Sequence, residues 1–403
     1  MRRKLSRMCL IALVLAFVTG CWSRRELNEL AIVTGIGIDK VGNEYLLSMQ
    51  VLNMGQAGSE GSGGGSGGGS GLPVTTQYMK AGSVFEGIRR LTTVLPRKLY
   101  FAHIRALVFS EELAREGLRD ILDLFVRDHE IRPDFFLIVT KGVEARQVMS
   151  LVLPIEQSPA TSMLKSLEIS EKNWDPSVAI TLDEYITDLM KEGKEGVITG
   201  LEINGTPEQG QTEDNLKSVT PSAFFRFSSI GIFKNDKLVG WLNEEESRGF
   251  SYITDRVDAT VSEVPCASGG KATVEILRSK SSLKGSAHRG KPLITIEIEA
   301  EGNIGEISCR EDVSKPETIY AFERRTEQKI DGYIKQAVRK ARQSGRSDIF
   351  GFGEAIHRYD PRNWKRLKDD WDRHFMSAKV ETRIDVKLRR TGKVGQSFID
   401  KMK

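Results

Sequence analysis

Cys21 follows an N-terminal segment that is first basic and then apolar, and this segment decides which part of the chain can fold. Basic residues precede Met8, and an apolar run continues from there to Val18. That run is too short to cross a bilayer, which takes ~20 helical residues. A basic head, a short apolar stretch and small residues before a cysteine are typical of an export signal. We therefore expect residues 1–20 to be a lipoprotein signal peptide that is removed.

A cysteine at the first mature position is the lipid acceptor of bacterial lipoproteins, so Cys21 is the predicted lipidation site. Acyl chains hold a protein firmly at a membrane, because each buried CH₂ contributes ~0.8 kcal/mol. No second apolar run of spanning length follows Cys21. We therefore expect a water-soluble body on the outer face of a membrane. The alternative is an ordinary secreted protein whose mature chain happens to begin with cysteine.

The charge of the mature body excludes one class of partner. The chain has 403 residues and a formal net charge of +4. Basic residues of the leader account for this entire excess, so the body after Cys21 is formally neutral. A neutral body gives no ground for nucleic-acid binding. An apolar fraction of 39% and a charged fraction of 28% are typical of folded domains, and a body of this length is expected to form two or three of them.

The first part of the body has the pattern of a sheet domain. Residues 21–142 alternate short apolar strands with amphipathic helices and predict an N-terminal α/β sheet domain. Residues 31–39 and 45–53 predict a β-hairpin. A Gly/Ser-rich tract at 58–71 has no apolar side chain and is interpreted as a flexible loop between strands. Residues 143–220 predict a helical middle region that ends in a linker.

The last part of the body, residues 221–403, predicts a C-terminal α+β domain. A hairpin is expected at 228–241, around Asn235-Asp236. Apolar residues repeat at helical spacing over 317–342 and predict one long amphipathic helix. Further strands are predicted at 271–278, 293–300 and 380–389. The predicted fold class is therefore α+β, a multi-domain body with mixed or antiparallel sheets, in which the long helix packs on the C-terminal sheet.

The sequence offers little for catalysis. Its five histidines do not fall in a metal-binding frame, and acidic residues are plentiful without a fixed spacing. We predict no catalytic residue, no cofactor, no metal site and no enzymatic activity. Cys266 and Cys309 remain in the exported body, where a disulfide could persist. The alternative is two buried thiols that pack as small apolar side chains.

Several segments taken together resemble a known family. They keep their order over nearly the whole chain, and only the tract at 58–71 departs from the pattern. The matching segments are Cys21–Leu30 after the leader, Gly35–Asp39, Arg97–His103, Arg127–Arg132, Glu301–Glu306, Asp348–Gly353 and Pro361–Trp364. In this set the chain resembles the Ger(x)C lipoproteins, which are the C subunits of GerA-type spore germinant receptors.

This resemblance implies three α+β domains of unusual topology and a lipoprotein anchored through Cys21 on the outer face of the spore inner membrane. It also implies assembly with the integral membrane A and B subunits into a receptor that nutrients trigger, with no enzymatic activity. Whether the C subunit contacts the germinant itself is left open. Two other classes of exported lipoprotein remain as alternatives: a solute-binding lipoprotein that serves a transporter, and a surface hydrolase.

Overall fold

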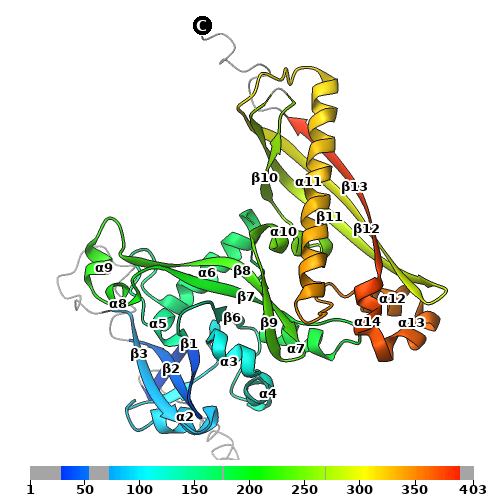
Figure 1. The fold of residues 1–403 in the computed structure, drawn as a ribbon. Coiled ribbons are helices and arrows are strands. Elements are labelled where there is room, and N and C mark those ends of the chain that lie inside the picture. Colours follow the sequence, from blue (N-terminus) through cyan, green and yellow to red (C-terminus); the bar gives the residue numbers. More distant parts are fainter. Residues whose placement is uncertain (1–28, 54–71, 175–176, 268, 391–403) are drawn as a thin grey trace, which may run out of the picture.

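The computed structural model describes residues 29–53, 72–174, 177–267 and 269–390. Cys21 and the tract at 58–71 lie outside these ranges. Within them the strands form one nine-stranded and one four-stranded sheet. Figure 1 shows the two sheets in separate parts of the molecule. We call residues 29–242, with the larger sheet, the first lobe, and residues 244–390, with the smaller sheet, the second lobe.

The first sheet has parallel strands at its centre and antiparallel strands at both sides. Its order is β3-β2-β1-β5-β6-β7-β8-β9, and β4 pairs with the start of β1. Strands β1, β5, β6 and β7 are mutually parallel. The strands are β1 (Leu30–Val41), β2 (Glu44–Leu52), β3 (Val74–Ala81), β4 (Lys98–Tyr100), β5 (Ala106–Phe109), β6 (Phe136–Thr140), β7 (Val197–Gly205), β8 (Ala223–Lys234) and β9 (Lys237–Leu242).

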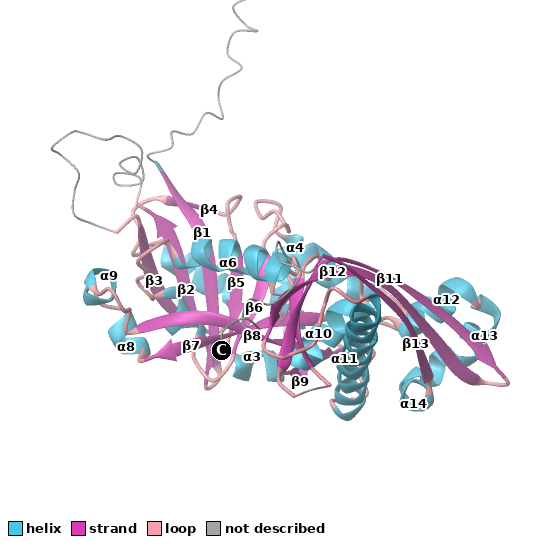
Figure 2. Cartoon of the chain, turned by 90° about the horizontal axis from the view of Figure 1, so that it is seen from above, coloured by secondary structure: helices cyan, strands magenta, loops and turns pink. Residues whose placement is uncertain are grey.

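Helices cover both faces of this sheet (Figure 2). One apolar cluster joins α5 and α6 to one face, and the main core joins α2, α3, α4 and α7 to the other. Both faces are therefore buried, as the continuous apolar sequence of the central strands requires. The helices are α2 (Val84–Leu91), α3 (Glu111–Glu116), α4 (Arg119–Arg127), α5 (Ala145–Met149), α6 (Pro159–Asn173), α7 (Leu182–Met190), α8 (Pro207–Gly210) and α9 (Asp214–Lys217).

The second sheet has the order β10-β11-β12-β13, in which β13 runs parallel to β12. Its strands are β10 (Thr260–Pro265), β11 (Lys271–His288), β12 (Lys291–Ile307) and β13 (Lys379–Arg390). The predicted strands at 271–278 and 293–300 are therefore parts of one long hairpin that continues to a turn at Arg289-Gly290, where both residues have positive φ. The extension was not expected, because residues 279–292 are mostly polar and small.

The long helix α11 (Pro316–Gln343) packs on this sheet, and its buried residues follow the helical repeat. Ser344 is its C-cap, and Gly345 beyond it has φ of 71°. The other helices of the second lobe are α10 (Glu244–Ile253), α12 (Phe352–Tyr359), α13 (Pro361–Leu367), η2 (Lys368–Asp370) and α14 (Trp371–Ser377). The α+β class, the mixed sheets and the long helix packed on the C-terminal sheet are confirmed.

The predicted domain limits at residues 142 and 220 both fall inside the first sheet. Strand β7 follows the first limit and pairs with β6, and the β8–β9 hairpin follows the second and pairs with β7. The hairpin itself lies where the sequence predicts it, with Asn235 at φ of 53° in its turn. Turn and loop signals locate the ends of elements, but they carry no information about which sheet a strand joins.

Candidate functional site: the joint between the two lobes

The carboxylate of Asp348 organises the contact between the lobes. Its Oδ1 accepts hydrogen bonds from the backbone N–H groups of Gly351 and Phe352, both at 3.1 Å. Its Oδ2 accepts from the N–H of Gly353 and from Trp371 Nε1, both at 2.9 Å. These donors belong to the start of α12 and to α14, so one side chain fixes the positions of two helices. The segment Asp348–Gly353 is one of those that carry the family resemblance.

Asp348 is fully buried, and burial raises its pKa from 3.8 to about 6, although its hydrogen-bond donors act in the opposite direction. The guanidinium of Arg342 on α11 lies near enough for its charge to be attracted to Asp348. A buried carboxylate is costly unless it is paired and hydrogen-bonded. Four donors and a nearby cation offset part of this cost, and the raised pKa shows that burial still outweighs them. We interpret Asp348 as a structural anchor.

The lobes are in direct contact at Gly193, Gly353 and Trp364, which are packed tightly against one another. A Cβ atom placed on Gly193 of the first lobe would lie 2.7 Å from the Cα of Gly353 and 2.6 Å from the ring of Trp364. Trp364 is buried, and its Nε1 donates to Glu192 at 3.1 Å. The backbone N–H of Glu354 donates to the carbonyl of Gly193 at 3.3 Å. The loop after α7 therefore lies against the helices of the second lobe.

Polar contacts at the rim complete this joint. The ammonium of Lys234, at the end of β8, lies 2.7 Å from Glu195 and 2.6 Å from Asp372. Burial by itself would lower the pKa of Lys234, but hydrogen bonds to Asp372 and Glu195 outweigh it and raise that pKa. The N–H of Glu195 also donates to the carbonyl of Asp348 at 2.9 Å. Residues from both lobes thus share one network.

A cleft of about 540 Å³ opens beside the joint, between α4, α7 and α14. Its apolar wall includes Leu122, Ile186 and Met190, and Met190 is 80% exposed. Its lysines are already paired, since Lys191 and Lys194 contact Asp188 at 3.0 and 2.7 Å. A cleft of this size suits a small molecule, but its paired lysines leave Arg119 as the one lining cation without an ion pair among the described residues.

A second buried aspartate performs a similar task in the first lobe. Asp39 in β1 accepts from the backbone N–H groups of Ala145 and Arg146 at 2.7 and 2.9 Å and so caps α5. Burial raises the pKa of Asp39 to about 6. Glycines at positions 35 and 37 let α5 and α6 approach this strand, because a Cβ at Gly35 would lie 2.7 Å from that of Ala160. The Gly35–Asp39 segment therefore has a packing role.

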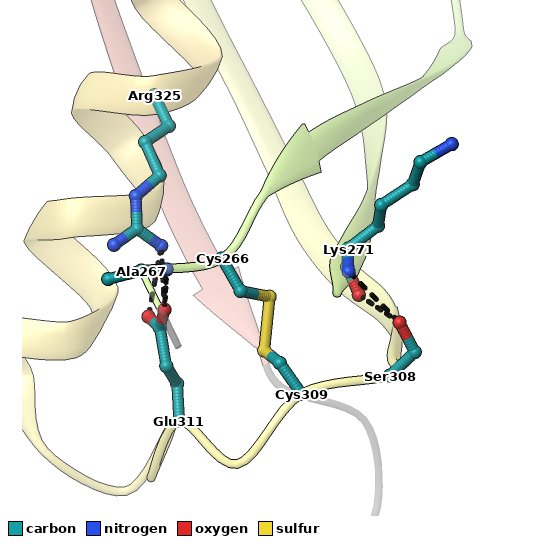
Figure 3. The surroundings of a disulfide bond; sticks show 7 residues. All are labelled: Cys266, Ala267, Lys271, Ser308, Cys309, Glu311 and Arg325. Atoms are coloured by element: carbon teal, nitrogen blue, oxygen red, sulfur yellow. Dashed lines mark hydrogen bonds and ion pairs between the residues drawn. A yellow bond between two sulfur atoms is a disulfide. The ribbon is translucent and has the colours of Figure 1, made fainter. Parts of the chain in front are cut away.

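The structure brings together the two cysteines considered for a bridge and joins them by a disulfide (Figure 3). Their Cα atoms are 6.4 Å apart, within the usual span of a disulfide. Glu311 beside them accepts from Arg325 of α11 at 2.9 Å and from the N–H of Ala267. Cys266, Cys309 and Glu311 are the one group of three metal-ligand residues among the described residues. A sulfur in a disulfide is not the thiolate that metal binding needs.

The sequence anticipated only part of the joint. The basic and aromatic stretch at 358–373 is typical of a helix whose aromatic side chains face inward. Trp364 and Trp371 are buried, whereas Tyr359 is 54% exposed. The contact of this region with Gly193 had no signal in the sequence. Cys21, the predicted lipidation site, lies outside the described residues. Among the described residues, no helix combines the length and apolar character needed to cross a bilayer.

Comparison with known proteins locates the chain in a family. A family model described as a spore germination protein N-terminal domain matches residues 23–203. A second, described as spore germination B3/GerAC like, C-terminal, matches residues 228–392. The chain belongs to the GerAC family of spore germination proteins. The resemblance to Ger(x)C proteins is thereby confirmed.

GerAC-family relatives match nearly the whole length of this chain. Spore germination protein KC of Bacillus subtilis (strain 168) is 28% identical over 395 residues, which cover 96% of each chain. Spore germination protein B3 of the same organism is 24% identical and covers 97% of this chain and 99% of its own. A crystal structure of the GerBC protein has the same fold, with a TM-score of 0.53 and 20% identity over 88% of this chain and 96% of that one.

Proposed function

We propose that this GerAC-family chain is a lipid-anchored accessory subunit of a nutrient germinant receptor. In this role it assembles with integral membrane A and B subunits on the outer face of the spore inner membrane and helps to trigger germination. The observation that carries the proposal is the match of both lobes to spore germination family models, together with relatives named for germination that align over their whole length.

The proposed mechanism is assembly without catalysis. Acyl chains on Cys21 would confine the body to the membrane surface, and confinement raises the effective concentration of one partner beside another. The joint around Asp348 favours such a role, because it holds two lobes in one orientation. A body with fixed lobes can contact two partner surfaces at once without the entropic cost of ordering a flexible connection.

Replacement of Cys21 tests the proposal in spores. The Cys21→Ala variant should lose membrane retention and respond slowly to nutrients, whereas Cys9→Ala, which changes a cysteine inside the leader, should behave as wild type. Mass analysis of the mature N-terminus should find acyl chains on Cys21. Full retention and a normal nutrient response in Cys21→Ala would overturn the anchoring. Cross-linking with mass spectrometry in spore membranes should recover integral membrane partners, and their absence would contradict the assembly.

A solute-binding lipoprotein is the second candidate, because the cleft beside the joint has a suitable size. That class binds its ligand tightly between two lobes. The paired lysines of the cleft weigh against it. Calorimetric titration of the purified protein with nutrient mixtures distinguishes the two functions. Stoichiometric binding that is lost when Met190→Asp is introduced into the cleft would favour the solute-binding function.

A further inference from the structure

The segment from Cys21 to β1, which we call the tether, joins the first sheet at the edge where its parallel strands begin. Strands β1, β5 and β6 run in the same direction, so the segments that precede them lie at one edge. Residues 97–105 precede β5, and Leu30 at the start of β1 pairs with Lys98 in β4. The chain that leads from Cys21 to β1 therefore ends beside residues 97–105. In Figure 1 this edge is remote from the tips of β10, β11 and β12.

This edge carries an unusual run of charge. From Gly87 to Ser110 the sequence contains five arginine and lysine residues and no acidic residue. Arg89, Arg97 and Arg105 are exposed, and no ion pair joins any of them to a carboxylate among the described residues. We call these three residues the basic edge.

The other charges nearby are largely paired. Lys98 contacts Glu130 at 2.9 Å, and Arg90 contacts Glu86 at 2.7 Å. On the loop before β6, Asp134 pairs with Arg132 at 3.3 Å. These acids therefore do little to neutralise the basic edge. Glu29 before β1 and Asp128 near Arg89 form no ion pair among the described residues and offset part of its charge, so the basic edge keeps a small excess of positive charge.

Apolar side chains stand among these cations. Val94 is 51% exposed, Phe85 is 46% exposed and Tyr100 is 37% exposed. Phe85, Arg89 and Lys98 line one shallow hollow of about 320 Å³, together with Arg127 and the acids Asp128 and Glu130. The guanidinium of Arg89 lies 4.9 Å from the centre of the Phe85 ring. Cations interleaved with exposed apolar and aromatic groups suit the interface of a bilayer, where phosphates and the upper acyl region meet.

The tether limits how far this edge can be from the membrane. Eight residues, from Trp22 to Glu29, separate Cys21 from the first strand. Fully extended, the nine Cα–Cα steps from Cys21 to Leu30 span at most about 32 Å. We propose that the basic edge lies on the bilayer and binds the headgroups of anionic phospholipids, so that it orients the body on the membrane. This proposal rests on the proposed anchoring through Cys21, because the tether supplies the proximity.

The test uses the full-length acylated protein in vesicles, with a fluorophore on Thr93→Cys beside the basic edge. Lipids with nitroxide headgroups quench the fluorophore only at short range. A label on Gln328→Cys, which is exposed on α11, reports the second lobe. We expect the label at position 93 to be quenched about twofold more in vesicles with phosphatidylglycerol than in pure phosphatidylcholine. Salt at ~0.5 M should remove the difference. The label at position 328 should show no such difference.

A matched pair of triple variants tests whether the charge of the basic edge causes the dependence on phosphatidylglycerol. The variant Arg89→Gln/Arg97→Gln/Arg105→Gln should lose the dependence on phosphatidylglycerol. The control Arg310→Gln/Arg324→Gln/Arg339→Gln removes three exposed arginines of the second lobe and should keep it. Circular dichroism checks that both variants fold.

Flotation of the vesicles separates the two proposals. If the wild-type protein does not float with vesicles, the anchoring fails and the orientation on the membrane fails with it. If the protein floats but the label at position 93 is insensitive to lipid charge, only the lipid-facing edge is overturned, and an acidic protein surface becomes the better partner for these arginines.

Discussion

Gly193 and Gly353 lie so close together that neither position has room for a side chain. A Cβ on either residue would be 2.7 Å from the Cα of the other. Because both obstacles are backbone atoms, the space cannot be recovered by rotating a side chain. The two lobes are therefore in direct backbone contact at this point.

The Gly353→Ala substitution should accordingly loosen the joint. We expect a loss of about 1–3 kcal/mol in the free energy of unfolding, typical of overpacking, measured by urea denaturation. Gly332→Ala is the control, since this glycine lies inside α11 with nothing within 4 Å of an added Cβ. Gly332→Ala should raise the free energy of unfolding by up to about 1 kcal/mol, because glycine is a poor helix former. Equal effects at the two positions would refute the close contact.

The two tryptophans of the joint should differ in how much their hydrogen bonds contribute. Trp371→Phe removes a donor from the buried Asp348, so we expect a loss of about 1–3 kcal/mol in unfolding free energy beyond the change in packing. Trp364→Phe removes a donor from Glu192, an exposed carboxylate that water can solvate. Loss of this hydrogen bond should lower the free energy of unfolding by less than about 1 kcal/mol. The comparison uses the same substitution twice, and a larger loss at Trp364 would contradict the role assigned to Asp348.

Local sequence patterns predicted the elements of this fold better than their arrangement. The alternation in β12 and β13 and the helical repeat of α11 are strong because one face of each is buried and the other is wet. In β11 the residues beyond Arg278 are mostly Ser, Lys and Gly, which give no clear alternation, and their strand depends on pairing with β12. Pairing with β12, and not local propensity, therefore determines that this part of β11 is a strand.

The joint shows even more clearly that local sequence does not predict which parts of the chain come into contact. Positions 193 and 353 are far apart in the chain, and a glycine gives no sign of the backbone that it will meet. The two glycines at 351 and 353 favour a tight loop, and Gly351 has φ of 76°. Trp364 and Trp371 could be assigned to the interior because tryptophan is mostly buried, but nothing local identified Glu192 or Asp348 as their partners.

Strand register explains how the two remaining cysteines meet. Pro265 of β10 pairs with Lys271, and Ala272 beside it pairs with Ile307 of β12. Cys266 and Cys309 thus follow strands that end at the same edge of the second sheet. Sequence alone could not supply this register, so it could not choose between a bridge and two thiols.

We predict that the bridge forms in the exported protein and stabilises the second lobe. The two cysteines are 43 residues apart, and closing a loop of that length corresponds to about 4 kcal/mol in the chain-entropy treatment. The Cys266→Ser/Cys309→Ser variant should therefore lose about 2–4 kcal/mol in unfolding free energy, and a reductant should have the same effect on the wild type. Mass spectrometry of unreduced peptides checks the bridge directly. Free thiols in the mature protein, or a reductant-sensitive double variant, would contradict it.

The titration of Asp348 should make the stability of the joint depend on pH in a particular direction. Its pKa is about 6 in the folded chain and 3.8 as an ordinary aspartate. Between these values the folded state binds more protons than the unfolded state, so this group's contribution is greatest below pH ~4 and falls as pH rises to ~6. The Asp348→Asn variant lacks this titration. Relative to it, the wild type should lose about 1.4 kcal/mol of unfolding free energy per pH unit in that window, with no further change above it. Asp39, whose pKa is also about 6, titrates in both proteins, so its effect cancels in the difference. Urea denaturation at several pH values measures both curves, and a difference that stays flat or grows with pH would show that Asp348 is ionised throughout.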